Sequence, residues 1–233
     1  MKCGKVESLW VYPVKSLMGE CLQKLNIEEI GIAGDRLFAI SDSNGKFGSG
    51  KNTRRFRRIN GLFSLSAKVL VNGVAIRFSD GSVLTNTDSL IDRKLSEMLG
   101  QSVTLTKERD ISHFDDGAIH LLTTASLSLL SKRLRNSAID SRRFRPNIVI
   151  KSDYLDQDLI GKRLKIGQAV IEITNKTERC HMITMRQSDL EKKTEILKTI
   201  AKDFDLNFGV YAKVISTGVI SVGENVEIFN KET

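Results

Sequence analysis

The feature that most constrains the fold is the stretch at residues 66–86, "SAKVLVNGVAIRFSDGSVLTN". It holds three short β-branched runs, which are separated by an Asn-Gly pair and an Asp-Gly pair. These pairs between alternating hydrophobic residues are strong β-hairpin signals, because their residues tolerate a positive φ. The stretch therefore predicts hairpins and antiparallel sheet.

Strand-like and helix-like periodicities alternate irregularly along the rest of the chain. The order is strands, helix, strands, helix, strands, and it lacks the regular βαβα alternation of a doubly wound fold. We therefore expect a mainly β protein, a sheet or barrel with a few helices. Strands are expected at residues 5–14, 22–30, 35–45, 102–107, 142–151, 163–174 and 207–229, and helices at residues 86–100, 123–136 and 188–204.

Each expected helix carries an apolar stripe and a terminal signal. The first ends at Gly100. The second has Thr124 as a plausible N-cap. The third opens with Ser188 and Glu191 at the spacing of a capping box.

The chain of 233 residues is long enough for one large or two modest domains. If there are two, they join in the polar segment at residues 107–118, "KERDISHFDDGA". The apolar runs are strand-sized and too short to cross a membrane. The first residues contain no apolar stretch typical of a secretory signal, so we expect a cytoplasmic protein without a membrane anchor.

The net charge of +8 calls for a partner or an explanation, and much of it lies in two clusters, residues 51–58 and 142–145. A solvated basic surface, nucleic acid and an anionic small molecule such as a phosphorylated cofactor all remain open. Aromatic residues make up only 6% of the chain, which provides few stacking surfaces for single strands. A phosphate-bearing ligand is therefore favoured over nucleic acid.

The stretch "GKFGSGKN" at residues 45–52 fits the phosphate-loop pattern only partly. Asn52 stands where Ser or Thr would bind magnesium, and the following "TRRFRR" does not read as an amphipathic helix. We interpret it as a glycine-rich, basic surface loop.

Three short motifs carry polar groups suited to an anion. "YPVKS" offers Lys15 and Ser16, and "GDR" offers Arg36, although simple strand ends explain both equally well. In "RRFRPNIVI", Pro146 should push Arg145 into an extended conformation. Arg143, Arg145 and Asn147 would then share one strand face, which either binds phosphate or is a charged face exposed to water.

Cys180 lies between Arg179 and His181, and it is one of three scattered cysteines. Their number and spacing exclude a disulfide framework and argue against a structural zinc site with the usual ligand spacing. A lone cysteine is most often a small buried hydrophobe. Neighbouring cations, however, favour a thiolate that can bind a soft metal or act as a nucleophile.

In this order, "YPVKS", "GDR", "HLLTTASL", "RFRPNIVI", "RC" and "FGVYAKVISTGVISVGENVEI" resemble the molybdenum cofactor sulfurase C-terminal (MOSC) superfamily. The resemblance is to members with an additional N-terminal domain. It implies an N-terminal β-barrel domain at residues 1–110, packed on a MOSC β-barrel domain at residues 111–233, with a shared cofactor pocket.

The resemblance also implies a molybdenum cofactor (molybdopterin with Mo), with Cys180 as the metal ligand and catalytic residue. Independently of any motif match, we expect Lys51 or Arg54 at the rim of the pocket. The implied cofactor-binding residues are Lys15, Ser16, Arg36, Thr124, Ser126, Arg145 and Asn147.

By the same resemblance, the protein is expected to be an oxidoreductase. It would reduce small N-hydroxylated substrates, such as amidoximes and hydroxylamines, with electrons from a separate electron-transfer protein. Thr177 stands where many relatives have a second cysteine, which excludes two-cysteine chemistry. The alternative is a carrier of sulfur, as a Cys180 persulfide, or of the molybdenum cofactor. The superfamily is also associated with pyridoxal phosphate binding.

Overall fold

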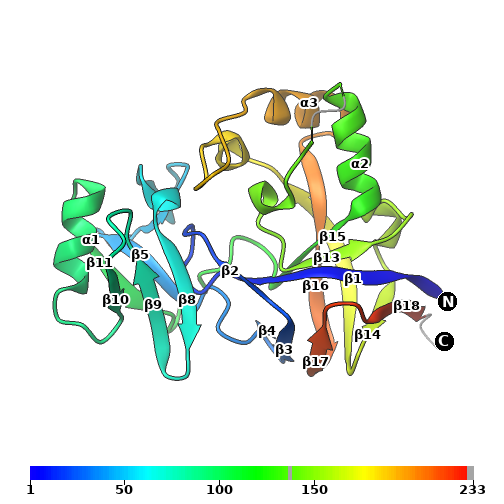
Figure 1. Ribbon diagram of the computed structural model, residues 1–233, viewed down its shortest axis with the longest axis horizontal. Helices are drawn as coiled ribbons and strands as arrows, with labels where there is room; N and C mark the ends of the chain where they lie inside the picture. The colour runs from blue at the N-terminus through cyan, green and yellow to red at the C-terminus, as the bar shows by residue number, and fades with distance from the viewer. Residues whose placement is uncertain (136–137, 230–233) are drawn as a thin grey trace.

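The computed structural model describes residues 1–135 and 138–229. It confirms a mainly β fold with three α-helices among these residues. Figure 1 shows two lobes side by side, with α2 (Thr124–Arg133) and α3 (Glu195–Asp203) on the larger lobe and α1 (Ile91–Leu99) on the smaller. No helix in the described ranges is long and apolar enough to span a membrane.

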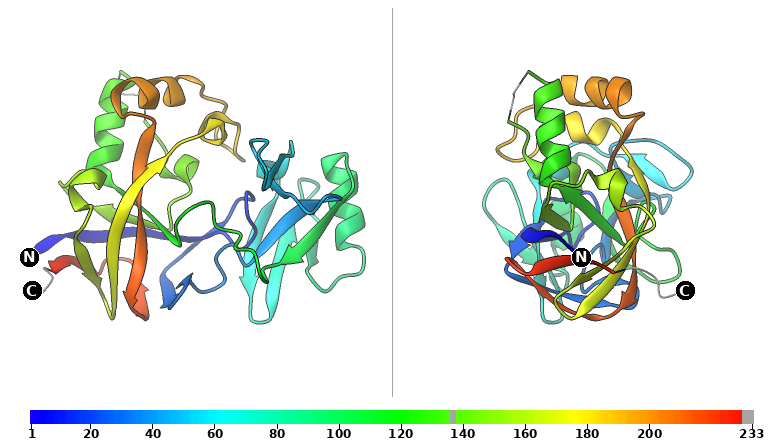
Figure 2. Two further views of the ribbon diagram at one scale, coloured as in Figure 1. Left: turned by 180° about the vertical axis from the view of Figure 1, so that it is seen from behind. Right: turned by 90° about the vertical axis from the view of Figure 1, so that its right-hand side faces the viewer.

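The larger lobe is a closed barrel of seven strands, seen from two further sides in Figure 2. It closes because β1 pairs with β18 on one edge and with β13 on the other. Alternating side chains from these strands fill the barrel with aliphatic residues. The barrel strands are β1 (Lys2–Val11), β12 (Ile119–Thr123), β13 (Ile148–Lys151), β14 (Arg163–Ile166), β15 (Ala169–Glu178), β16 (Asn207–Ser216) and β18 (Asn225–Phe229).

The smaller lobe has its own apolar core beneath α1. One sheet has the order β11-β5-β6-β7 and the other β10-β9-β8. Their strands are β5 (Phe38–Asp42), β6 (Phe47–Ser49), β7 (Phe56–Arg58), β8 (Ser66–Leu70), β9 (Gly73–Arg77), β10 (Val83–Thr85) and β11 (Val103–Lys107).

The predicted hairpins are confirmed, since β9 pairs with β8 and with β10. Leu70 pairs with Gly73, so the first turn lies at Val71 and Asn72, one residue earlier than the Asn-Gly pair.

The chain runs out to the smaller lobe and back within residues 12–19, leaves the barrel for the smaller lobe at residues 33–37 and returns at residues 108–118. Between the first two of these segments it stays with the barrel. There, β2 (Glu20–Leu22) pairs with β1, and β3 (Lys24–Glu28) joins a sheet with β4 (Gly31–Ile32) and β17 (Gly218–Ser221). By strand pairing, β1 to β4 thus belong to the larger lobe. In the segment between β1 and β2, Val14 and Met18 instead bridge to Phe38 and Ser66 of the smaller lobe.

Two predicted helix starts are wrong. Thr123, rather than Thr124, caps α2, because its hydroxyl accepts the Ser126 backbone N–H. Helix α3 begins at Glu195 rather than at Ser188. Ser188 instead has φ 48° in a turn closed by hydrogen bonds between Gln187 and Leu190. The predicted end of the second helix at Asn136 lies outside the described residues.

The strand predicted at residues 142–151 is only partly present. Residues Ser141–Phe144 form a 3-10 turn, because the Asp140 carboxylate accepts the Arg142 backbone N–H and caps it. Arg145 then adopts φ 56° and ψ 49°, so the predicted extended conformation is wrong. Strand β13 begins only at Ile148, and Arg143 and Arg145 do not share a strand face.

Candidate functional site

A cavity of about 110 Å³ lies where the crossing segments meet the barrel. It brings together residues that are far apart in the sequence, and both lobes contribute to its wall. Of the metal- and cofactor-binding residues that the resemblance implies, Lys15, Ser16, Arg36, Arg145 and Cys180 line it.

Three of these residues have a left-handed backbone that side-chain-bearing residues rarely adopt. The φ angles are 64° at Ser16, 52° at Arg36 and 56° at Arg145. Such a conformation costs on the order of 1 kcal/mol or more per residue and tends to persist at functional sites. The convergence of three such residues on one cavity therefore marks it as a candidate site.

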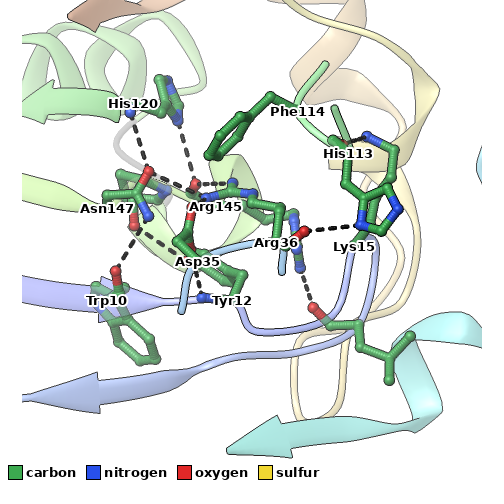
Figure 3. Close-up of polar contacts among 12 residues, drawn as sticks. Trp10, Tyr12, Lys15, Asp35, Arg36, His113, Phe114, His120, Arg145 and Asn147 are labelled. Atoms are coloured by element: carbon green, nitrogen blue, oxygen red, sulfur yellow. Dashed lines mark hydrogen bonds and ion pairs between the residues drawn. The ribbon is translucent and has the colours of Figure 1, made fainter. Parts of the chain in front are cut away.

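Arg36 has a permanent counter-ion beneath the cavity (Figure 3). Its guanidinium forms an ion pair with the fully buried Asp35 carboxylate, which also accepts the Tyr12 backbone N–H at 2.7 Å. The Asn147 side-chain oxygen Oδ1 accepts from Arg36 at 3.2 Å and from the His120 backbone N–H at 3.1 Å. Asn147 lies behind the cavity wall, where it positions Arg36.

Three other guanidiniums in the wall have no carboxylate partner among the described residues: that of the buried Arg143 and those of the half-buried Arg145 and Arg179. Arg145 stacks on the Tyr12 ring, 4.2 Å from its centre, and donates to the Leu17 carbonyl. Burial lowers the pKa of Arg145 to about 10. Arg179 donates to the Phe144 carbonyl at 2.9 Å, while its buried Nε has no partner.

Lys15 also lines the cavity and is buried, with 3% of its side chain exposed. Its ammonium donates to the His113 carbonyl at 2.7 Å and pairs with the Asp115 carboxylate at 3.0 Å. It also lies over the Phe56 ring, 4.6 Å from the centre. Burial lowers the pKa of Lys15 to about 8, against the opposing effect of Asp115.

Cys180 is a half-buried free thiol directly after β15. Between the strand and Cys180 lies Arg179, whose backbone N–H donates to the Leu206 carbonyl at 2.7 Å. Arg179 lines the cavity with the thiol, whereas His181 is exposed, with Nδ1 3.2 Å from the Thr184 hydroxyl. Of the two cationic neighbours in sequence, only Arg179 faces the site.

The other predicted residues are placed as follows. Lys51 lines the cavity, and Arg54 is exposed and does not line it. Thr124 bonds to Ser152 through its hydroxyl, and Ser126 lines a different cavity near α3. The interpretation of "GKFGSGKN" as a surface loop is only partly right, because Phe47–Ser49 form strand β6 and Gly48 and Ser49 are buried. The stretch that follows forms strand β7 rather than the helix of a phosphate loop.

Sequence reasoning missed four residues of the wall: Phe114, Asp115, His120 and Tyr211. Burial lowers the pKa of His120, so its imidazole is neutral. Gly209 packs so closely that a Cβ there would lie 2.2 Å from His120 Nε2. From the sequence, "HFDDG" at residues 113–117 reads only as part of the polar segment that joins two domains. The acidic residues directly after Phe114 are the sequence feature that marks this part of the wall.

The donor chemistry of the cavity fits an anionic ligand that brings its own metal. Buried cations outnumber buried carboxylates in its wall, and Arg179 Nε is an unsatisfied donor. No cluster of three His, Cys, Asp or Glu that could hold a metal ion occurs in residues 1–135 and 138–229. A metal here would therefore need ligands from a cofactor, beside the single Cys180 thiolate.

Comparison with known proteins agrees with these features. Residues 3–113 match the MOSC N-terminal beta barrel domain, and residues 108–227 match the MOSC domain. Molybdenum cofactor sulfurase of Oryza sativa subsp. japonica is 22% identical over 96% of this chain, which spans only 34% of that relative. The one of Drosophila pseudoobscura pseudoobscura is 36% identical over 32% of the chain and 10% of its own length.

The fold is also shared with a solved structure. The YUAD protein of Bacillus subtilis superposes with a TM-score of 0.56 at 13% identity, over 97% of this chain and 94% of that one.

Proposed function

Because this chain belongs to the MOSC family, whose domains are associated with molybdenum cofactor sulfurase function, we propose that it binds a molybdenum cofactor. In this proposal, Cys180 is the thiolate ligand of molybdenum. The protein reduces N-hydroxylated compounds, such as amidoximes and hydroxylamines, and receives electrons from a separate protein.

One observation carries the proposal: the only half-buried free thiol described shares its cavity with the guanidiniums of Arg145 and Arg179, which have no carboxylate partner among the described residues. Burying charges without partners is costly, so such a wall is stable only if an anion completes it. Lys15, Arg36 and Arg145 supply donors for the anionic part of the cofactor. Cys180 supplies the soft ligand for the metal.

The residues of the chain divide the work between binding and orientation. Two-electron redox chemistry would come from the bound cofactor. Arg36 and Arg145 hold its anionic groups, and the Asn147 amide fixes the direction of Arg36. In the overall reaction, the substrate N–O bond breaks, two electrons and two protons are consumed, and water leaves.

The test is metal and pterin content by mass spectrometry, on protein produced in a host that makes the cofactor. Wild type, Cys180→Ala and Cys21→Ala would be compared, because Cys21 is an exposed thiol on β2 outside the cavity. We expect near-stoichiometric molybdenum in wild type and Cys21→Ala, and a loss in Cys180→Ala. Reduction of an aromatic amidoxime with a chemical electron donor should follow the same pattern.

The names of the relatives favour a second candidate, a carrier of sulfur or of the cofactor. In that case Cys180 holds sulfur as a persulfide, and N-hydroxylated substrates are not turned over. Neither metal nor pterin in folded protein, together with reaction of Cys180 with persulfide probes, would favour the carrier. Metal retained in Cys180→Ala would exclude this thiol as the ligand.

A further inference from the structure

The last crossing segment closes one side of the cavity. Phe114 and Asp115 line it, and Figure 3 shows the Phe114 ring beside the Arg145 and Arg36 side chains. The segment is held mainly through its backbone, since Arg55 donates to the Ser112 carbonyl at 2.6 Å and to the Phe114 carbonyl at 3.3 Å.

The two acidic residues beside the cavity are held in very different ways. Asp35 is completely buried and is bound by both the Arg36 guanidinium and the Tyr12 backbone N–H. The Asp115 side chain is 58% exposed, and Lys15 is its one side-chain partner in the described part of the chain. Asp35 is therefore a fixed counter-ion, whereas solvent can take up the Asp115 carboxylate without breaking any other contact.

We propose that the Asp115 carboxylate occupies the position on Lys15 that an anionic group of the ligand takes when it binds. A ligand then enters only if it binds Lys15 more strongly than Asp115 does. Its carboxylate lies on Lys15, where an anionic group of the ligand would lie. Binding is then an exchange of one anion for another on the same ammonium.

Charge decides which anions succeed in this exchange. A small monoanion replaces one carboxylate by another and gains little. A phosphate dianion gains additional attraction to Arg36 and Arg145, which lie in the same wall. Asp115 thus excludes common monoanions and admits phosphate-like groups. The inference shares with the proposed function only the premise that this cavity binds an anion.

The test follows protection of the Cys180 thiol from iodoacetamide by inorganic phosphate and by acetate, read by mass spectrometry of the Cys180 peptide. Wild type, Asp115→Asn and Asp116→Asn would be compared without cofactor. Asp116 is the exposed neighbour, and its carboxylate accepts from Asn175 instead of Lys15.

In Asp115→Asn, phosphate should protect at about tenfold lower concentration, because the competing charge is gone. Acetate should also begin to protect, whereas Asp116→Asn should behave as wild type. In wild type, phosphate should also speed amide hydrogen exchange at residues 112–117, because phosphate that replaces Asp115 on Lys15 releases that segment.

Equal protection curves for the three proteins, or no protection by phosphate in any of them, would overturn the inference. Its failure is separable from failure of the proposed function. Phosphate protection without molybdenum in the purified protein would remove the proposed cofactor and leave the role of Asp115 intact.

Discussion

Two cavities meet at the start of β16, and they differ in size and in charge. The cavity between α2 and α3 measures about 440 Å³, against about 110 Å³ for the cavity at Cys180. The larger one is lined by apolar side chains such as Leu129 and Phe208 and by exposed charged ones such as Lys202 and Asp203. The one buried acid among its described lining residues is Asp156. That carboxylate accepts the backbone N–H groups of Thr123 at 2.6 Å and Gly209 at 3.1 Å.

The two cavities differ in whether the charged and hydrogen-bonding groups of their walls have partners. In the larger cavity, the buried charge is fully bonded to the backbone, so nothing in it requires a ligand. In the smaller cavity, Arg145 and Arg179 have no carboxylate partner among the described residues, and Arg179 Nε has no acceptor. Unbalanced buried charge, more than volume, therefore identifies the candidate site.

The largest expected effect comes from adding a side-chain atom where Gly209 of the larger cavity packs against His120 of the smaller one. Gly209 has φ +88°, and a Cβ would lie 2.2 Å from His120 Nε2. Gly209→Ala should lower the free energy of unfolding by about 3 kcal/mol, through backbone strain and overpacking together. Urea unfolding would measure it.

Gly223→Ala is the matched control, because Gly223 has φ +85° with nothing within 4 Å of a Cβ. It should cost only about 1 kcal/mol, which is the strain alone. Equal losses in the two variants would mean that His120 does not press on Gly209.

The next effect concerns the acid of the larger cavity. Burial raises the pKa of Asp156 from 3.8 to about 6, against the opposing backbone donors. The folded state therefore binds the proton more tightly than the unfolded state. This contribution favours folding most below about pH 4, and it is lost as the pH rises to about 6.

Asp156→Asn should remove this dependence. The difference in unfolding free energy between wild type and variant should change by about 2 kcal/mol between pH 4 and pH 7, with wild type relatively more stable at low pH. Urea unfolding at several pH values would measure it. Parallel stability curves would show that the carboxyl has an ordinary pKa.

A third change removes one unpaired cation from the smaller cavity. Arg145→Met should weaken phosphate protection of Cys180 by about tenfold or more, because a charge-assisted contact is lost. Stability should change by less than about 1 kcal/mol, since the lost bond to Leu17 is offset by no longer burying a charge.

Arg142→Met is the control, since Arg142 pairs with Asp140 and Asp189 outside the cavity. Similar losses of protection in both variants would mean that overall charge, rather than the cavity, attracts phosphate.

The smallest effect is expected from removing cations at the larger cavity. Lys176 and Lys202 line it and are exposed, so solvent and salt screen them. The double change to Ala should alter phosphate protection of Cys180 by less than about twofold. A larger loss in the same alkylation assay would show that the two cavities share one anion site.

Local signals in the sequence were enough for much of the fold. The hairpins at residues 66–86 and the stop of α1 at Gly100 follow from turn chemistry and periodicity. Capping failed at Ser188, because a tertiary hydrogen bond from Lys193 to Thr184 holds the chain in a turn until α3 begins. The capping-box spacing carries no information about that contact.

Sequence motifs were enough to select Lys15, Arg36, Arg145 and Cys180, which the structure brings to one cavity. The resemblance of these motifs to a family, rather than residue type alone, selects them. The site was not predictable where the role depends on long-range placement. The left-handed conformation of Arg145 arises from the capped turn before it, which the neighbouring Pro146 did not reveal. Asp115 acquires a role only because residues 108–118 cross beside Lys15.

The pairing of β1 has a consequence for how the protein reaches its native state. Its barrel partners, β13 and β18, lie more than a hundred residues later in the chain. Contacts of such high sequence separation slow folding, since a long loop must close first. On the ribosome, β1 can pair only with the short strand β2 until both barrel partners have been synthesised. A fragment cut at the join of the two family domains would lack this strand and expose two sheet edges to aggregation.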